Sequence, residues 1–384
     1  MSHNQEKTTE GKKGLRTWLE SEVSALKSNI KTFRDLIGPD VKMMGVVKSN
    51  AYGHGLVDTA KEISHDVDWL SVDSIVEGAR LRQEGVTTPL LILGFTLPEM
   101  LTTAADADIS IAVSNFETLN AIQKTDFSKK LKIHIKTDTG MHRQGFLLSD
   151  IDAVLTELKK CANKIEVEGL FTHFSSAKNP SFPEYTKMQI AEFEQWRTAF
   201  KAAGYTPITQ AADTGGTILF PEAHYDMVRI GIGLYGLWPS GETEAYAKDR
   251  IALSPILTWK TIVSEVKKLP KGSKISYDGT ETLFRDSIVG VCPVGYWHGF
   301  PRSLSSIGRV LVNGEYAKIL GRVTMDMIII DLTDCGNVSV QDEVVLIGKQ
   351  GKTTMTAEQF AVIADGSWYE IVTRINPLIK KFFS

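Results

Sequence analysis

A single lysine stands between a short apolar run and a small, glycine-rich turn, in the segment Val46-Val47-Lys48-Ser49-Asn50-Ala51-Tyr52-Gly53-His54-Gly55. Residues 41–47 are mostly apolar and β-branched at their end, which predicts a buried strand rather than a helix. Lys48 therefore lies at the C-terminal end of a strand, which is the active-site face of a (β/α)8 barrel. A lysine that is partly withdrawn from water loses its proton readily and becomes a nucleophile toward an aldehyde. The position indicates Schiff-base chemistry, and the alternative is a solvated loop lysine.

The elements that would position this lysine alternate along the first two thirds of the chain. Segments such as 74–85 and 184–203 have the apolar spacing of helices. Short apolar runs, each a predicted strand, lie at residues 43–47, 90–94, 109–113, 131–136, 167–172, 209–212 and 227–231. Strand–helix alternation of this kind predicts a parallel sheet closed into a (β/α)8 barrel, with an open doubly wound sheet as the alternative.

The pattern changes after Trp238-Pro239-Ser240-Gly241 to closely spaced strands and turns. Strands are predicted within 259–269, at 309–312 and at 328–332, and Asn313-Gly314 is a strong hairpin signal. The predicted fold class is α/β plus β. It comprises a disordered leader at 1–13, a TIM-like barrel over 14–244 and a mainly-β C-terminal domain over 245–384. The leader is polar and lacks the apolar core of a secretion signal.

Composition describes an ordinary globular protein. The chain has 384 residues, 42% hydrophobic and 23% charged, with a net charge of −3. This charge gives no electrostatic reason to expect nucleic acid or an anionic membrane as a partner, and no apolar stretch approaches the roughly 18 residues that span a bilayer. The cysteines, Cys161, Cys292 and Cys335, have no metal-like spacing and suit a reducing cytoplasm. The apolar run around Cys292 favours a core residue over a nucleophile.

The lysine segment resembles the pyridoxal-phosphate lysine motif of the alanine racemases, a fold-type III family. The resemblance extends from Thr17-Trp18-Leu19-Glu20 to Tyr369-Glu370, so that it covers nearly the whole chain. It implies pyridoxal 5'-phosphate as cofactor, because removal of an amino acid's Cα proton requires an electron sink. It also implies L- and D-alanine as substrates, D-alanine for peptidoglycan as product, and a homodimer whose active sites are completed across the interface.

The resemblance assigns the two bases. Lys48 would hold the cofactor and act on the D-enantiomer, and Tyr277, in Lys274-Ile275-Ser276-Tyr277-Asp278-Gly279-Thr280, would act on the opposite face. A phenol is a base only where a nearby cation favours the phenolate. Outside this family pattern, a lone tyrosine is normally a core or rim residue.

The resemblance also assigns the cofactor contacts. Arg229, in Met227-Val228-Arg229-Ile230-Gly231, matches the arginine at the pyridine nitrogen, and His173 matches a histidine near the ring that holds this arginine. A guanidinium does not hand its proton to pyridine, which weakens the electron sink and limits transamination. Without the resemblance, Arg229 could be part of a structural salt bridge and His173 a core residue, and no ligand spacing suggests a metal. The resemblance places the phosphate at hydroxyls and backbone N–H groups of Tyr52, Thr214, Gly231, Ile232 and Tyr369.

Substrate contacts follow from two further motifs. In Lys136-Thr137-Asp138-Thr139-Gly140-Met141-His142-Arg143, Lys136 matches a lysine that is carbamylated in many relatives, and Arg143 matches the arginine that contacts the substrate carboxylate. Carbamylation turns a cation into an anion, which would hold Arg143 by a charge-assisted pair. Met325 would help to bind the substrate carboxylate, and Asp326 and Tyr296 would line the entrance.

Three segments depart from the family pattern. Gln210-Ala211-Ala212-Asp213-Thr214 replaces His-Ala-Ala-Asn-Ser, which places a carboxylate beside the phosphate site. Gly295-Tyr296-Trp297-His298-Gly299 replaces Gly-Tyr-Ala-Asp-Gly at the entrance, and Thr324 replaces a cysteine. A serine or broad-specificity racemase therefore remains an alternative. A fold-type III decarboxylase lacks these racemase-like motifs, and a non-catalytic pyridoxal-phosphate carrier lacks the second domain.

Overall fold

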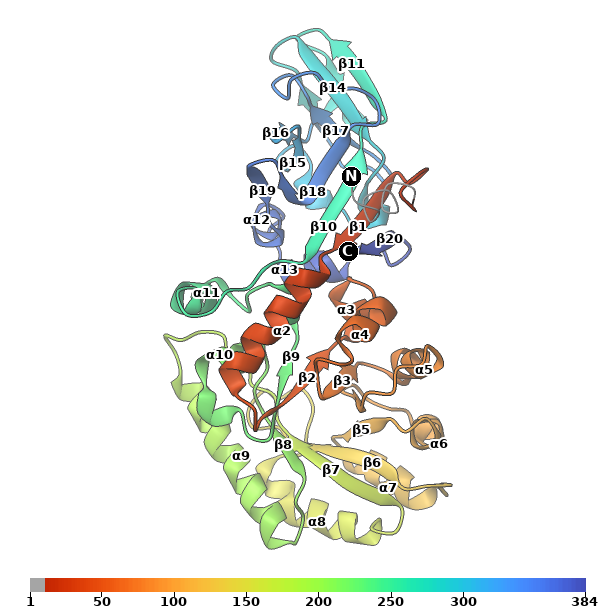
Figure 1. The fold of residues 1–384 in the computed structure, drawn as a ribbon, viewed down its shortest axis with the longest axis vertical. Helices are drawn as coiled ribbons and strands as arrows, with labels where there is room; N and C mark the ends of the chain where they lie inside the picture. The colour runs from red at the N-terminus through yellow and green to blue at the C-terminus, as the bar shows by residue number, and fades with distance from the viewer. Residues whose placement is uncertain (1–10) are drawn as a thin grey trace. The chain divides into compact units, whose positions relative to one another are not determined.

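A computed structural model describes residues 11–384 as two compact units (Figure 1). The barrel unit comprises Ser24–Ala51 and Leu56–Pro255. The β unit comprises Tyr52–Gly55, Ile256–Ser384 and the described residues up to Val23. Most of the predicted leader lies outside the described residues. Within it, Lys12 pairs with Glu20, with 2.5 Å between Nζ and Oε1.

The barrel unit is built on eight parallel strands between residues 42 and 230. Their spatial order is β8-β7-β6-β5-β4-β3-β2-β9. Backbone hydrogen bonds from Asp226 N to Thr209 O (3.1 Å) and from Arg229 N to Ala212 O (2.9 Å) join the two ends of this order, so the sheet is a nearly closed TIM-like barrel, as predicted. The strands are β2 (Lys42–Val46), β3 (Trp69–Val72), β4 (Leu90–Ile92), β5 (Ser110–Val113), β6 (Leu131–Lys136), β7 (Ile165–Phe171), β8 (Ile208–Gln210) and β9 (Met227–Ile230).

Each predicted barrel run corresponds to one of these strands, and β3 was missed. All four residues of β3 are buried, so its sequence lacks the polar alternation that marks a half-exposed strand. Ser71 interrupts the run, so at most two apolar residues stand together in it.

Helices cover the barrel as the apolar spacing predicts. In α9 (Glu184–Ala202) the buried side chains Gln189, Phe193, Trp196 and Phe200 recur at intervals of three or four residues. The other α-helices are α2 (Val23–Ile37), α3 (Lys48–Tyr52), α4 (Leu56–Ile63), α5 (Ile75–Gln83), α6 (Leu101–Asp106), α7 (Phe116–Lys124), α8 (Ile151–Lys160), α10 (Thr214–Leu219) and α11 (Gly241–Ala247). Short 3₁₀ turns in this unit are η1 (Pro98–Met100), η2 (Leu148–Asp150), η3 (Pro221–Ala223) and η4 (Ile232–Tyr235).

The β unit contains a sheet of order β16-β15-β18-β10-β1-β20, with β19 added to β18, and a smaller sheet β11-β14-β17. The first strand of the chain, β1 (Thr17–Ser21), pairs antiparallel with β10 (Leu257–Ile262) and parallel with β20 (Lys380–Phe383). The segment that the sequence places at the start of the barrel domain therefore supplies a strand to the β unit. The run 259–269 is divided between β10 and β11 (Glu265–Leu269), which belong to different sheets.

The predicted hairpin is present, since β15 (Arg309–Val312) pairs with β16 (Glu315–Lys318) across Asn313 and Gly314. Both loop residues have positive φ, 53° and 82°, as a two-residue turn of this kind requires. The remaining elements are β12 (Lys274–Ile275), β13 (Glu281–Thr282), β14 (Ser287–Cys292), β17 (Ile328–Asp331), β18 (Glu343–Gln350), β19 (Thr353–Met355), α12 (Ala357–Ile363), α13 (Trp368–Thr373), η5 (Tyr277–Gly279), η6 (Tyr296–His298) and η7 (Arg302–Leu304).

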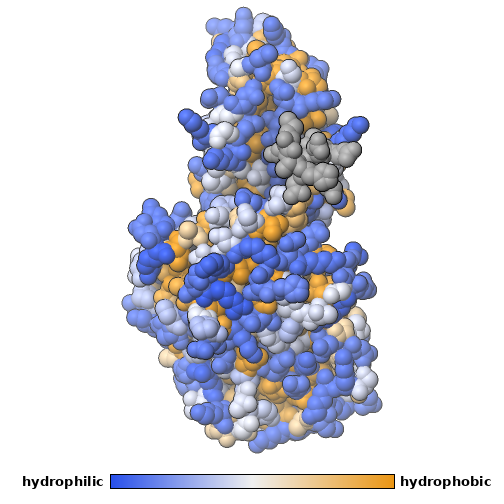
Figure 2. All heavy atoms as spheres, in the orientation of Figure 1, coloured by the Kyte–Doolittle hydropathy of each residue, from blue (hydrophilic) through white to orange (hydrophobic). Residues whose placement is uncertain are grey.

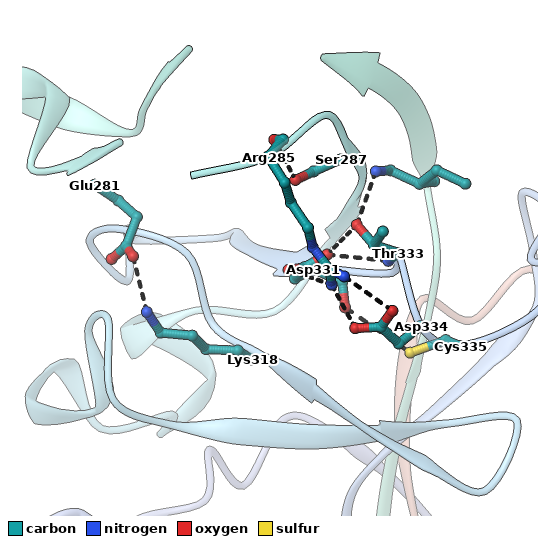
Figure 3. Close-up of polar contacts among 9 residues, drawn as sticks. Glu281, Arg285, Ser287, Lys318, Asp331, Thr333, Asp334 and Cys335 are labelled. Atoms are coloured by element: carbon teal, nitrogen blue, oxygen red, sulfur yellow. Dashed lines mark hydrogen bonds and ion pairs between the residues drawn. The ribbon is translucent and has the colours of Figure 1, made fainter. Parts of the chain in front are cut away.

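Ion pairs anchor the segment between β12 and β14, which carries Tyr277 (Figure 3). Lys318 pairs with Glu281 at 2.8 Å. Arg285 pairs with Asp334 through two hydrogen bonds, one of them 3.1 Å between Nη1 and Oδ1. The segment is therefore tied at its C-terminal side to two other parts of the β unit.

Hydrophilic residues cover most of the face seen in Figure 2, with apolar residues scattered among them. Within residues 11–384, no helix combines the length and apolar content needed to cross a membrane. The three cysteines are free and buried, and burial raises the pKa of the Cys292 thiol, which agrees with a core role.

Candidate active site

Candidate residues of the barrel unit gather at the C-terminal ends of its strands. Lys48 follows β2, Lys136 ends β6, His173 follows β7, Thr214 follows β8, and Arg229 lies within β9. Parallel strands bring their carboxyl ends to one face of the barrel. Residues spread over 180 positions of sequence are therefore collected at the face where barrel enzymes bind their substrates.

Lys48 begins a turn of left-handed backbone. The φ angles of Ser49, Asn50, Ala51 and Tyr52 lie between 52° and 56°, a conformation that costs roughly 1–2 kcal/mol per residue outside glycine. Asn50 stabilises the turn because its side chain accepts from Leu56 N (3.0 Å). Strain of this kind persists where a functional group must be held in place.

The charged neighbour of Lys48 is Asp73, which follows β3, with 3.7 Å between Nζ and Oδ1. Sequence reasoning missed Asp73 because it missed β3. An acid directly after a barrel strand is the signal that could have found it.

Arg229 is buried and hydrogen-bonded by the ends of the adjacent strands. Its Nη2 donates to Thr172 O (2.8 Å) and Ala211 O (2.9 Å), and lies 3.4 Å from His173 Nδ1. Burial lowers the pKa of Arg229 to about 10, so the guanidinium remains charged at pH 7. Burial and the Arg229 charge lower the pKa of His173 well below its ordinary value, so the imidazole is neutral and accepts the hydrogen bond. The predicted pairing of these two residues is present.

A chain of hydrogen-bonded side chains extends from the buried Arg229 to the partly exposed Glu168. Arg229 Nη1 donates to Gln210 Oε1 (3.3 Å), and Gln210 Nε2 donates to His134 Nδ1 (3.0 Å). His134 Nε2 lies 3.3 Å from Glu168 Oε2, which also accepts from Ser110 Oγ (2.5 Å). Sequence reasoning missed His134 and Glu168, and it noted Gln210 only as a departure. The Gln210 amide can join the charged Arg229 to His134, because its oxygen accepts from Arg229 and its N–H donates to the imidazole.

Lys136 is almost fully buried, and its Nζ donates to Gln144 Oε1 (3.0 Å). Burial, and after it the charge of Arg143, lowers the pKa of Lys136 to about 8. The Lys136 amine lies 5.7 Å from the centre of the Phe171 ring, and the Arg229 guanidinium lies 5.4 Å from the same centre. Lys136 is therefore a cation surrounded by cations, which is the repulsive arrangement expected of the unmodified lysine.

The loop after β6 presents Arg143 to solvent. Asp138 shapes this loop, because its Oδ1 accepts from Gly140 N (3.0 Å) and His142 N (2.9 Å). Tyr185, from α9, donates to Gly140 O (2.7 Å) and fixes the turn from outside. Arg143 itself is exposed, so its guanidinium is available to an anion.

Thr214 lies at the start of α10, where donors converge. Its Oγ1 accepts from Gly231 N (3.1 Å) and Gly233 N (3.4 Å). Because both N–H groups donate to Thr214, the donor left for a phosphate oxygen is the O–H of Thr214 itself. Asp213 caps α10 by accepting from Gly216 N (2.9 Å), and burial raises its pKa above the ordinary value, which favours the neutral carboxyl beside this site. The site thus fits the phosphate end of pyridoxal phosphate.

The other predicted phosphate contacts, Tyr52 and Tyr369, meet within the β unit. Their ring centres are 6.3 Å apart, at 51°. The approach depends on Gly53, where φ is 89° and an added Cβ would lie 1.9 Å from Val372 O. The structure thus pairs two tyrosines that are 317 positions apart in the chain.

The remaining candidates are exposed side chains of the β unit, with Tyr277 at 70%, Met325 at 55% and Tyr296 at 44%. Two departures from the family pattern are neighbours here, since Tyr296 N donates to Thr324 O and Trp297 N to Met325 O, both at 3.0 Å. Thr324 Oγ1 donates to Met327 O (2.8 Å), so this threonine closes its own turn. Asp326, next to Met325, is also exposed.

Two family models match the chain. Residues 22–239 match "Alanine racemase, N-terminal domain" and residues 256–383 match "Alanine racemase, C-terminal domain". The alanine racemase of Symbiobacterium thermophilum is 39% identical over 96% of this chain and 98% of its own length. That of Methanococcus maripaludis is 38% identical over 95% of this chain and 98% of its own.

Solved structures agree with these relatives. The alanine racemase of Bacillus anthracis with bound L-Ala-P superposes with a TM-score of 0.91 at 34% identity, over 96% of this chain and 95% of that one. An alanine racemase of Clostridium difficile gives 0.90 at 31% identity, over 96% of both chains. The two domain models together span the barrel and the β unit, and each relative and each solved structure covers almost the whole chain. The chain therefore belongs to the alanine racemases, the pyridoxal-phosphate-dependent isomerases that interconvert L- and D-alanine.

Proposed function

We propose that the chain racemises alanine with two bases, Lys48 for the D-enantiomer and Tyr277 for the L-enantiomer. The observation that carries the proposal is the gathering of Lys48, Lys136, His173 and Arg229 at the carboxyl ends of the barrel strands. A racemase must remove the Cα proton from one face and return a proton to the other. A lysine and a tyrosine can each donate and accept a proton, so the pair suffices for both directions.

Pyridoxal phosphate, when bound, stabilises the charge left at Cα after proton removal. We assign its binding to Lys48, Tyr52, His173, Thr214, Arg229, Gly231, Ile232 and Tyr369. Arg229 keeps its proton at the pyridine nitrogen, because a pKa of about 10 leaves the guanidinium charged at pH 7. The neutral His173 and the oxygens of Thr172 and Ala211 orient Arg229. This arrangement weakens the electron sink and should suppress transamination.

Substrate recognition is assigned to Arg143 and Met325, with Lys136 carbamylated. Carbon dioxide adds to a neutral amine, and a pKa of about 8 makes the neutral form of Lys136 accessible. The resulting anion would pair with Arg143 and remove the repulsion between the two cations.

We further propose a cytoplasmic homodimer that supplies D-alanine for peptidoglycan. The three free cysteines suit a reducing compartment. Tyr277 is 70% exposed, which is compatible with a residue that completes the site of a second copy. Trp297 and His298, with Asp326 and Tyr296, would shape the entrance. The division into a leader, a barrel domain and a β domain, with boundaries near 13 and 245, belongs to the same proposal, except that β1 is part of the β unit.

The test is an enantiomer-resolved assay of the purified protein with L-alanine, L-serine and other L-amino acids. Alanine should be converted fastest. Tyr277→Phe should lower the rate about 10²- to 10⁴-fold, while the visible absorbance of bound cofactor persists.

The matched control is Tyr316→Phe, which removes a phenol of the same unit that donates to Thr354 O (2.9 Å). Full activity in Tyr277→Phe would overturn the role of this tyrosine. If serine were turned over faster than alanine, the serine or broad-specificity racemase would become the better description of the function.

A further inference from the structure

Tyr277 stands between two residues in left-handed backbone. Ser276 has φ 66° and Asp278 has φ 60°. Neither residue is glycine, so each conformation is unfavourable on its own and must be held by its surroundings. The orientation of the phenol therefore depends on whatever holds residues 276 and 278.

One residue, Arg322, holds both. Its carbonyl oxygen accepts from Ser276 Oγ (3.1 Å), and its guanidinium Nη2 lies 3.0 Å from Asp278 Oδ2. The backbone of Arg322 thus fixes the residue before Tyr277 and its side chain fixes the residue after it. We call Ser276, Asp278 and Arg322 the Tyr277 clamp.

The neighbouring glycine permits this approach. At Gly321, φ is 68°, and an added Cβ would lie 2.6 Å from Ser276 Cβ and 3.0 Å from Ile275 O. The segment of Arg322 therefore packs directly on the segment of Tyr277. The same segment continues to Met325, so the clamp links two residues that the proposed function assigns to the substrate.

We propose that Arg322 and Asp278 are positioning residues for Tyr277, an inference that rests on the proposed function of this tyrosine. Proton transfer requires the phenol oxygen within hydrogen-bond reach of Cα, and small misplacements are costly. The ion pair is partly exposed, at 39% for Arg322 and 70% for Asp278. An exposed pair contributes little to the stability of the fold. Its loss should accordingly change the kinetics and leave the melting temperature almost unaltered.

The experiment compares Asp278→Asn and Arg322→Met with wild type, both as holoenzymes. Each variant should lower kcat about fivefold, and Arg322→Lys should recover part of the loss because it retains the charge. The matched control is Asp334→Asn, which removes the same charge from another exposed pair tied to the same segment, that with Arg285 (Figure 3). This control should keep wild-type kcat.

The decisive measurement is the primary isotope effect with Cα-deuterated alanine, in each direction separately. The enantiomers have equal free energy, so kcat/KM falls equally in both directions and does not identify the impaired base. If Tyr277 is mispositioned, removal of deuterium from L-alanine becomes more rate-limiting and its isotope effect rises, while that of D-alanine falls. A loss of activity that does not act through Tyr277 would lower both rates without changing the ratio of the two isotope effects.

The outcomes separate the two proposals. If Tyr277→Phe is inactive but the clamp variants behave like Asp334→Asn, the clamp is refuted and the proposed function stands. If Tyr277→Phe is fully active, the proposed role of the tyrosine fails first. In a Tyr277→Phe background, Asp278→Asn should cause no further loss, and an additional loss would show that Asp278 acts elsewhere. Should Asp278→Asn fold poorly, Asp278→Gly removes the same carboxylate and adopts positive φ without strain.

Discussion

The burial of individual side chains decides which of them carry charge at the barrel's strand ends. Arg229 stays protonated with a pKa of about 10, whereas His173 is kept neutral by burial and by the neighbouring guanidinium. Lys136, with a pKa of about 8, lies between these cases. A group of this kind is about one tenth neutral at pH 7 and half neutral at pH 8.

The dependence of activity on carbon dioxide tests whether the partly neutral Lys136 is carbamylated. Depleting bicarbonate should raise the KM for alanine several-fold, because an uncarbamylated Lys136 repels Arg143, and adding bicarbonate should restore it. The neutral fraction of Lys136 rises with pH and reaches one half at the pKa of about 8, so at equal concentrations of dissolved carbon dioxide recovery should be faster at pH 8 than at pH 7. Steady-state kinetics under nitrogen, with and without bicarbonate, measure both effects.

Lys136→Met should abolish the bicarbonate response. Lys130→Met, at an exposed lysine whose Nζ donates to Ala162 O, should retain it. A wild-type enzyme that ignores bicarbonate at both pH values would contradict carbamylation.

At the scale of secondary-structure elements, the left-handed turn after β2 is the feature that holds Lys48, the residue that we propose forms the Schiff base. Four strained residues follow Lys48, and Gly53 ends them with φ 89° in close contact with Val372 O of α13. The contact leaves no room for a Cβ at this position.

Gly53→Ala should lower the free energy of unfolding by about 2–4 kcal/mol, since it adds a clash to an unfavourable φ. Gly272→Ala is the control for φ alone, because Gly272 has φ 87° and an added Cβ would meet no atom within 4 Å. This control should cost only about 1–2 kcal/mol. Urea denaturation gives both values, and equal losses would show that the contact with Val372 relaxes freely.

At the scale of the whole molecule, the β unit exposes side chains to which the proposed function assigns roles in the chemistry. Tyr277 and Met325 are both more than half exposed, as is Trp297, whose backbone N donates to Met325 O. Exposed apolar groups of this size mark surfaces that meet another molecule. A second copy of the chain is the partner that we propose.

Mixing two inactive variants tests whether the sites are shared between copies. Lys48→Met and Tyr277→Phe should each be inactive alone. If each site takes its lysine from one chain and its tyrosine from the other, a refolded 1:1 mixture should recover about a quarter of wild-type activity, because half of the dimers then contain one intact site. A mixture that stays inactive would place both bases in one chain.

The sequence by itself determined the local features. Seven of the eight barrel strands were recognisable because their apolar runs must be buried, and Asn313-Gly314 was recognisable because its turn requires positive φ. Lys48 was recognisable from its place directly after an apolar run, and the family resemblance assigned Lys136 and Arg143. The family resemblance then added residues such as Tyr369, which carry no local signal of their own.

The tertiary structure decided which distant residues meet. It placed β1 between β10 and β20, set Asp73 beside Lys48, and joined Gln210 to His134 and Glu168. It also gave Arg322 its hold on both neighbours of Tyr277. Such contacts depend on how strands are ordered in a sheet and which faces are buried, and periodicity along the chain does not encode the partner of a polar side chain.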